Sequence, residues 1–155
     1  MLNELQVKNK IIENPQNYLS RYYLYDYEYP VFGLSKHSIG RIDLIIIRQE
    51  LFYLIEIKIP IKSLKENGFK PIFDSLKILA YRELFLFDTN KRRQQVKPVV
   101  MLPAEYLIST SKHFLRKLHI KFIPIYFTAT DNFKLDFDEL TKKIIPGWKE
   151  LNIKL

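Results

Sequence analysis

Two strongly apolar segments with charges in their middles constrain this sequence more than any other feature. Residues 39–48, IGRIDLIIIR, and residues 51–59, LFYLIEIKI, have the nearly continuous aliphatic and aromatic character of buried strands. Only Gln49 and Glu50 separate them. This spacing predicts a tight antiparallel hairpin, although the pair lacks the usual glycine or asparagine. Pro60 closes the second strand because it has no amide hydrogen to donate.

Both strands carry charged side chains where an apolar residue is expected. Asp43 interrupts the first, and Glu56 and Lys58 interrupt the second. Glu56 and Lys58 are two residues apart, so they leave the same face, and counting back from the hairpin places Asp43 about opposite Glu56. Burial of a carboxylate is costly unless a partner or a metal meets it. Two carboxylates and an ammonium suit a hard divalent cation beside a phosphate. The alternative is an exposed face where these charges pair in solvent.

The remaining elements predict a mixed sheet covered by helices, an α/β fold. Asn3 can cap a first helix that runs to about Glu13, with Leu5 and Ile12 on its apolar stripe. The further predicted elements are a strand at 22–32, a helix at 71–87, a strand at 97–102, a helix at 104–118, a strand at 120–128 and a helix at 136–145. This α-β-β-β-α-β-α-β-α order favours a sheet with helices against it.

The helix at 71–87 has two faces of interest. Its core stripe is predicted to hold Phe73, Leu76, Ala80 and Phe87. Lys77 and Tyr81 share another face, because residues four apart lie one above the other on a helix.

Composition limits the class of protein. The 155 residues contain no repeat and no Pro/Gly/Ser linker, so one domain over 1–155 is expected. The absence of cysteine excludes a disulfide framework and a thiolate zinc site. No apolar run approaches the ~20 residues needed to span a bilayer, and the polar start does not read as a secretory signal. We therefore expect an intracellular, cytoplasmic protein without a membrane partner.

The positive charge is concentrated in one part of the chain. The net charge is +8, and residues 91–121 hold eight basic side chains against the single acid Glu105. Such a concentration is the usual footprint of a polyanion partner, and the alternative is a solvated basic face that keeps the protein soluble. The candidate nucleic-acid contacts are Lys91, Arg92, Arg93, Lys112, Arg116 and Lys117.

GRID at 40–43 followed by LIEIK at 54–58 resembles the catalytic core of the PD-(D/E)xK nuclease superfamily. The predicted αβββαβ order matches the restriction-endonuclease-like fold of that superfamily, including its Holliday-junction-resolvase-like members. The opening ELQVKNKIIENPQNYL resembles the amino-terminal helix of RecB-like and archaeal structure-specific endonucleases. Lys77 and Tyr81 stand at the spacing of the Q-x-x-x-Y pair of the RecB-like branch, with lysine in place of glutamine.

The resemblance implies a role for each matching residue. Asp43 and Glu56 would be metal ligands, and Lys58 would be the catalytic lysine. Glu4 would be a supporting ligand or would position water, with Glu13 as the alternative. Lys77 and Tyr81 would steady the phosphate or the metal-bound water, although Lys77 could instead be a solvated helix lysine. The implied cofactor is Mg²⁺, with Mn²⁺ as a substitute, and the implied partner is DNA or another nucleic acid. A homodimer is compatible with the resemblance.

Three hypotheses follow from these observations. The first is a metal-dependent deoxyribonuclease that hydrolyses phosphodiester bonds. The second is a non-catalytic nucleic-acid-binding protein that retains the nuclease fold. The third is an unrelated α/β domain whose charges bind a protein partner. The intact Asp43, Glu56 and Lys58 favour the first over the second, and the basic segment disfavours the third.

Overall fold

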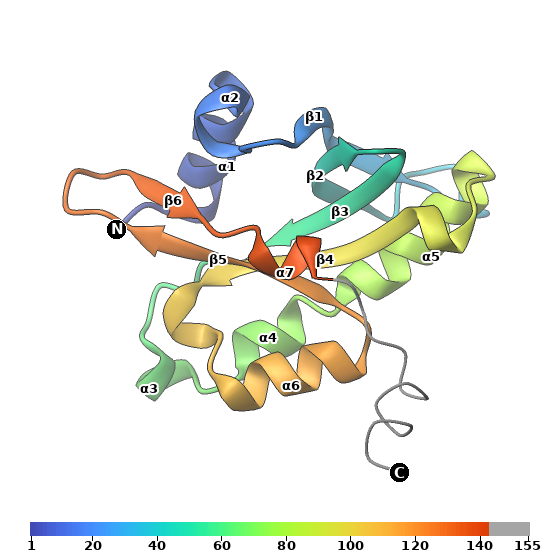
Figure 1. Ribbon diagram of the computed structural model, residues 1–155. Helices are drawn as coiled ribbons and strands as arrows, with labels where there is room; N and C mark the ends of the chain where they lie inside the picture. The colour runs from blue at the N-terminus through green and yellow to red at the C-terminus, as the bar shows by residue number, and fades with distance from the viewer. Residues whose placement is uncertain (143–155) are drawn as a thin grey trace, which may run out of the picture.

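A mixed sheet of six strands forms the centre of the computed structural model, which describes residues 1–142 (Figure 1). The strands follow one another across the sheet in chain order. They are β1 Tyr23–Val31, β2 Gly40–Arg48, β3 Leu51–Ile57, β4 Val96–Pro103, β5 Lys121–Phe127 and β6 Phe133–Leu135. β1, β2 and β3 form an antiparallel meander, β3, β4 and β5 run parallel, and β6 returns antiparallel to β5. The predicted α/β fold is confirmed.

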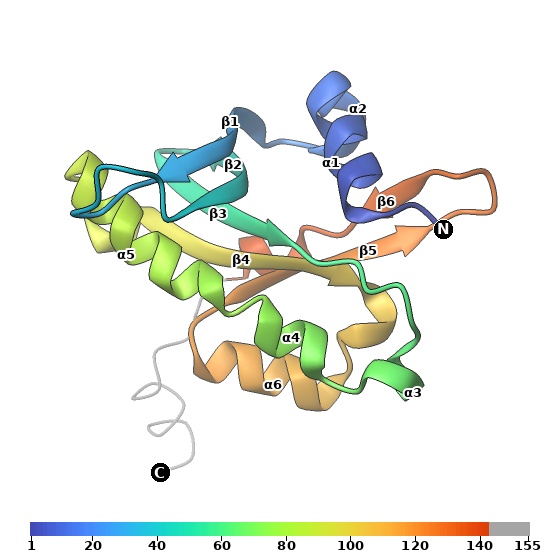
Figure 2. The same ribbon diagram turned by 180° about the vertical axis from the view of Figure 1, so that it is seen from behind.

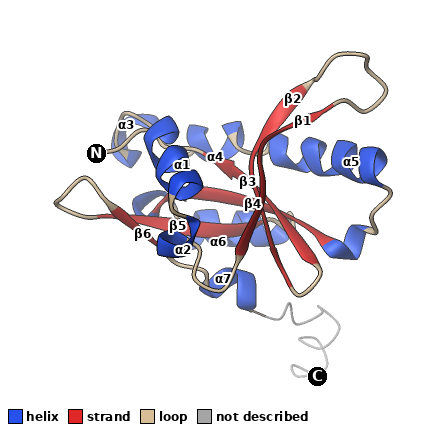
Figure 3. Cartoon of the chain, turned by 90° about the horizontal axis from the view of Figure 1, so that it is seen from above, coloured by secondary structure: helices blue, strands red, loops and turns tan. Residues whose placement is uncertain are grey.

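Helices cover both faces of this sheet (Figure 2). The helices are α1 Glu4–Glu13, α2 Pro15–Tyr18, α3 Leu64–Asn67, α4 Lys70–Asp74, α5 Lys77–Thr89, α6 Ser109–Lys117 and α7 Asp138–Thr141. One apolar core joins α1 to the sheet through Val7 and Ile11. A second core, on the other face, contains Ile78 and Phe85 of α5 and Leu115 of α6. Seen from above, β1 and β2 run across the direction of β5 and β6, so the sheet is strongly twisted (Figure 3).

The predicted hairpin between β2 and β3 is confirmed. Gln49 and Glu50 have φ angles of 51° and 67°, and two successive residues at positive φ give the turn a twist that suits a two-residue hairpin. The side chains that usually favour this turn are absent, so the pairing of two apolar strands must compensate for the local backbone cost. The resulting register pairs Leu44 with Ile55 and Arg48 with Leu51.

The first helix begins as predicted. The prediction of its apolar face was right for Ile12, which is partly buried against the first core, and wrong for Leu5. Asn3 and Gln6 form a capping box, in which the Gln6 amide donates to the Asn3 side chain at 2.8 Å and the Asn3 amide donates to the Gln6 side chain at 2.9 Å. Val7 and Ile11 are fully buried, whereas Leu5 is 57% exposed. The helix carries apolar residues on several sides, and the position of the sheet selects which of them is covered.

The predicted helix over 71–87 is divided into α4 and α5. Ser75 is buried at the break, and its hydroxyl donates to the Ile72 carbonyl at 2.7 Å, which competes with continuation of the helix. The break changes the helical phase, so the predicted core stripe was wrong except at Leu76, which is partly buried against the second core. Phe73, Ala80 and Phe87 are exposed, while Ile78 and Phe85 are buried instead.

Three other elements differ from the sequence predictions. The predicted helix over 104–118 starts with a separate 3-10 turn, Ala104–Tyr106, before α6. Strand β6 was not predicted, and it is only three residues long. Of the predicted helix at 136–145, α7 covers Asp138–Thr141, and residues 143–145 lie outside the described residues. Within residues 1–142, no helix has the length and apolar character needed to cross a bilayer.

Candidate active site

The candidate site lies where β2 and β3 stop pairing. The last paired residues are Leu44 and Ile55, and the next pair in the same register is Asp43 with Glu56. At this point the Asp43 side chain replaces the backbone ladder, because its Oδ2 accepts a hydrogen bond from the Ile57 amide at 2.7 Å. Asp43 therefore bridges the two separating strands.

Strand β2 changes face at Asp43. Leu44 lies in the core beneath α1 and Ile45 in the core beneath α5, as strand alternation requires. Ile42 also lies in the core beneath α5, although alternation would place it with Leu44. On the neighbouring strand β1, the position between the partners of Leu44 and Ile42 is Glu28, which has a φ of 47°. The pairing has the same register on both sides of Glu28, so the irregularity is confined to Glu28 and Asp43.

Glu56 is the most buried ionisable side chain of this region, with only 4% of its surface exposed. Its Oε1 lies 3.1 Å from Nζ of Lys77. Its Oε2 is buried and has no hydrogen-bond partner within residues 1–142. Burial and, second, the charge of Asp43 raise the pKa of Glu56 from 4.5 to about 7, against the opposing effect of Lys77.

Asp43 shares this electrostatic environment. Burial raises the pKa of Asp43, and the hydrogen bond from the Ile57 amide opposes the change. Two carboxyl groups that are both held above their usual pKa values form a site that attracts a cation or a proton. Perturbed carboxyl groups of this kind are enriched at functional sites.

Lys77 and Tyr81, on one face of α5, contact Glu56 of β3 and approach Gly40 of β2, respectively. Burial favours the neutral form of Lys77, but the hydrogen bond and charge of Glu56 outweigh it, so the pKa of Lys77 is raised. A Cβ atom at Gly40 would collide with the Tyr81 hydroxyl and ring. The glycine of the GRID segment thus permits Tyr81 to approach β2, which explains why this small residue precedes Asp43 by three positions.

Glu4 reaches the site from α1, on the other side of the sheet. Its Oε1 accepts a hydrogen bond from the Ile59 amide at 3.0 Å and lies 4.0 Å from Nζ of Lys58. Lys58 is thus nearer to Glu4 than to any other described carboxylate. Glu13, the alternative to Glu4, is exposed at the opposite end of α1, about 14 Å away along the helix axis.

Lys8 belongs to this region and was not identified from the sequence. Its ammonium pairs with Glu28 at 2.9 Å, and its charge partly opposes the rise that burial causes in the pKa of Asp43. Lys8 lies four residues after Glu4, on the same side of α1. That spacing was the available signal, and it became meaningful only once Glu4 was placed at the end of β3.

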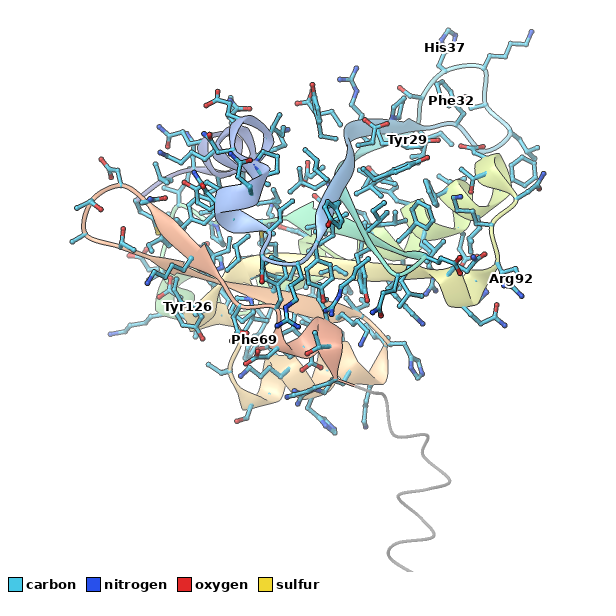
Figure 4. All side chains as sticks on the ribbon, turned by 45° about the horizontal axis from the view of Figure 1, so that its top comes forward. Tyr29, Phe32, His37, Phe69, Arg92 and Tyr126 are labelled. Carbon is cyan, nitrogen blue, oxygen red and sulfur yellow. The ribbon has the colours of Figure 1, made fainter. Side chains whose placement is uncertain are left out.

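The predicted nucleic-acid contacts are not gathered at this site. Lys91 lies over the ring of Phe52, with 4.2 Å from Nζ to the ring centroid, and Phe52 pairs with Val96 at the amino ends of β3 and β4. The candidate site is at the carboxyl end of β3. Figure 4 shows Arg92 at the edge of the molecule, well away from Phe69 of the segment that follows β3.

Two of the predicted contacts are already paired with acids. Arg93 binds Glu83 through both guanidinium nitrogens, with one distance of 2.7 Å. Arg116 binds Glu139 in the same way, at 2.9 Å for each bond. Lys112 and Lys117 lie with Arg116 on α6, and Lys112 and Arg116 both lie over the ring of Phe122 on β5. Within residues 1–142, no three His, Cys, Asp or Glu side chains are grouped closely enough to form a metal cage by themselves.

No protein-family model matches the sequence, and no curated protein matches it either. Among solved structures, a repair endonuclease from Pyrococcus abyssi superposes with a TM-score of 0.52 at 18% identity. The fold is similar to that of a repair endonuclease. The match covers 79% of this chain and 46% of the endonuclease, so the chain spans about half of that protein.

Two other solved structures resemble the chain over most of their own length. An fdxN element excision controlling factor protein from Anabaena variabilis has a TM-score of 0.50 at 12% identity and is covered to 95%, against 82% of this chain. An XisH family protein from Nostoc punctiforme PCC 73102 has a TM-score of 0.48 at the same identity and coverage. At such identities the likeness concerns the fold, and the chemistry has to be argued from the site.

Proposed function

We propose that this protein is a metal-dependent nuclease that hydrolyses phosphodiester bonds of DNA at the end of strand β3. The observation that carries the proposal is the buried Glu56 beside Asp43, with a carboxylate oxygen that no group within residues 1–142 satisfies. A buried oxygen of this kind requires a donor or a cation. The similarity to a repair endonuclease fold supports the same interpretation.

The residues present fit Mg²⁺ or Mn²⁺. Asp43 and Glu56 would hold the ion, and Glu4 would support it from α1. The two carboxylates that the site can supply suit Mg²⁺, which usually takes one or two carboxylates and keeps water or phosphate in its other positions. When bound, the ion would stabilise negative charge on the reacting phosphate and activate water.

The side chains around the carboxylates have separate tasks. Lys58, which follows the buried strand and lies near Glu4, would place its ammonium against the charge that develops on the phosphate. The Asp43–Ile57 hydrogen bond orients one carboxylate. The Lys77 ammonium pairs with Glu56 Oε1, so the partnerless Oε2 is the oxygen of Glu56 that would meet the ion.

The proposal is tested by cleavage of single-stranded, duplex and branched DNA in Mg²⁺ or Mn²⁺. Glu56→Gln should reduce cleavage by orders of magnitude, because the anion that holds the metal is lost with little change of shape. Lys58→Ala should also abolish cleavage but leave Mn²⁺ binding, measured calorimetrically, largely in place. Glu13→Gln, at the exposed far end of α1, is the matched control and should retain full activity.

The second hypothesis, a non-catalytic nucleic-acid-binding protein, also has a specific observation in its favour. Lys77 already supplies a positive charge to Glu56, which is where a catalytic ion would bind. The similarity to an excision controlling factor protein is consistent with this alternative. A protein that binds DNA yet cuts none of these substrates with any divalent metal would establish the second function and eliminate the first.

A further inference from the structure

The segment after β3 lies at the same edge of the sheet as the candidate site. β3 and β4 are parallel, and Glu56 is the penultimate residue of β3. In open sheets with parallel strands, ligands bind at the carboxyl ends of those strands. Residues 58–67 start at this edge and continue into α3. Lys62 precedes this helix and Lys65 lies within it.

The backbone of this segment is held in place. The Lys62 carbonyl accepts hydrogen bonds from the Tyr106 hydroxyl at 2.5 Å and from the Asn67 side-chain amide at 2.8 Å. Tyr106 is fully buried in the short turn that follows β4. The segment is therefore anchored to the carboxyl end of the neighbouring strand, while the side chains of Lys62 and Lys65 are exposed.

The two lysines have no ion-pair partner within residues 1–142. The other lysines of this edge do have one, because Lys58 lies near Glu4, Lys70 pairs with Asp74, and Lys77 pairs with Glu56. Glu66 follows Lys65 in the chain, and it is exposed. An anchored backbone that presents unpaired ammonium groups beside a carboxylate site suits a phosphate backbone.

We propose that Lys62 and Lys65 form the surface along which a nucleic-acid strand lies as it enters the candidate active site. This inference rests on the proposed function for its partner, a phosphodiester chain. It differs from the sequence prediction, which placed these contacts at Lys91, Arg92, Arg93, Lys112, Arg116 and Lys117. Of these residues, Lys91 lies at the opposite ends of β3 and β4. The difference arises because the carboxyl ends of β3 and β4, which are distant in the chain, lie side by side in the sheet. The segment with Lys62 is anchored there.

The test compares two double variants that each remove two positive charges. Lys62→Ala/Lys65→Ala changes the proposed surface, and Lys91→Ala/Arg92→Ala changes the far end of the sheet. Binding of a fluorescent 20-nucleotide single strand and of the matching duplex is measured by anisotropy in EDTA over a series of salt concentrations. EDTA separates binding from cleavage, and circular dichroism checks that both variants are folded.

The first variant should weaken binding on the order of tenfold in 0.1 M salt and reduce the slope of log K against log salt by about 1.4 to 1.8. The second should bind as the wild type does. Glu66→Gln should bind more tightly, because it removes the negative charge next to Lys65 in the chain. Unchanged binding by the first variant, an equal loss in both double variants, or no gain with Glu66→Gln would overturn the inference.

These outcomes are independent of catalysis. Binding that depends on Lys62 and Lys65 without cleavage would support the surface and refute the nuclease. If cleavage requires Glu56 but DNA binding is unchanged in Lys62→Ala/Lys65→Ala, the nuclease proposal is supported and the proposed surface is refuted.

Discussion

Replacing Glu56 with glutamine should stabilise the metal-free protein at pH 8. The wild-type fold has to bury this carboxyl group, and burial together with Asp43 raises its pKa from 4.5 to about 7. One pKa unit corresponds to about 1.4 kcal/mol, so ionisation of Glu56 costs the folded state about 3 kcal/mol. Glutamine has nearly the same shape and no charge to desolvate, so the variant avoids this cost.

The raised pKa of Glu56 determines how the free energy of unfolding changes with pH. An acid whose pKa is raised by folding binds its proton more tightly in the folded state, so its contribution to stability is complete below pH 4.5 and is lost as the pH rises through 7. The raised pKa of Asp43 acts in the same direction. The wild-type free energy of unfolding should therefore fall between pH 5 and pH 8 relative to that of Glu56→Gln.

The assay is urea unfolding in EDTA at pH 5, 6, 7 and 8, with Glu13→Gln as the control for loss of an exposed carboxylate. The advantage of Glu56→Gln over wild type should grow by about 2 to 3 kcal/mol across this range, and that of Glu13→Gln should stay near zero. Added Mn²⁺ at pH 8 should stabilise the wild type and leave Glu56→Gln unaffected. Parallel pH profiles for wild type and Glu56→Gln would refute the reasoning.

Three further predictions concern the framework of the site. Lys77→Gln removes an ammonium 3.1 Å from Glu56, so Mn²⁺ affinity, measured by calorimetry, should rise roughly tenfold as a competing charge is lost; weaker binding would mean that Lys77 organises the site for the ion. Gly40→Ala should lower the free energy of unfolding by about 1 to 3 kcal/mol, because the added methyl group collides with Tyr81; Tyr81→Ala in the same chain should relieve most of that loss, and simple additivity would contradict the contact. Asn3→Ala should cost about 1 kcal/mol through loss of the capping box, and thermal melting that does not distinguish it from wild type would exclude a role for the cap.

The sequence was sufficient for the features that depend on neighbours along the chain. The hairpin at Gln49 and Glu50 could be predicted because only two residues separate two apolar strands, and the same short connection determines that Asp43 stands opposite Glu56. The cap at Asn3 is likewise local. Such features involve a few residues and one set of hydrogen bonds, so the amino-acid types carry nearly all of the information.

Tertiary structure decided the features that join distant segments. Which side of α1 is buried depends on how the helix meets the sheet, so Val7 and Ile11 are covered rather than Leu5. The pairing of Lys77 with Glu56 requires α5 to pack against β3 after the helix breaks at Ser75. The spacing of apolar residues in the sequence did not predict this break.

For the basic residues, too, the sequence determined their positions along the chain and the tertiary structure determined their partners. The concentration of basic residues in 91–121 was visible in the sequence, but their partners were not. Arg93 is neutralised by Glu83 and Arg116 by Glu139, which lie 10 and 23 residues away. Lys62 and Lys65 occupy a less basic stretch, yet they stand unpaired, among the described residues, at the edge where β3 and β4 end. Charge acts through distance in space and through solvent exposure, and both are determined only when the sheet brings its strand ends together.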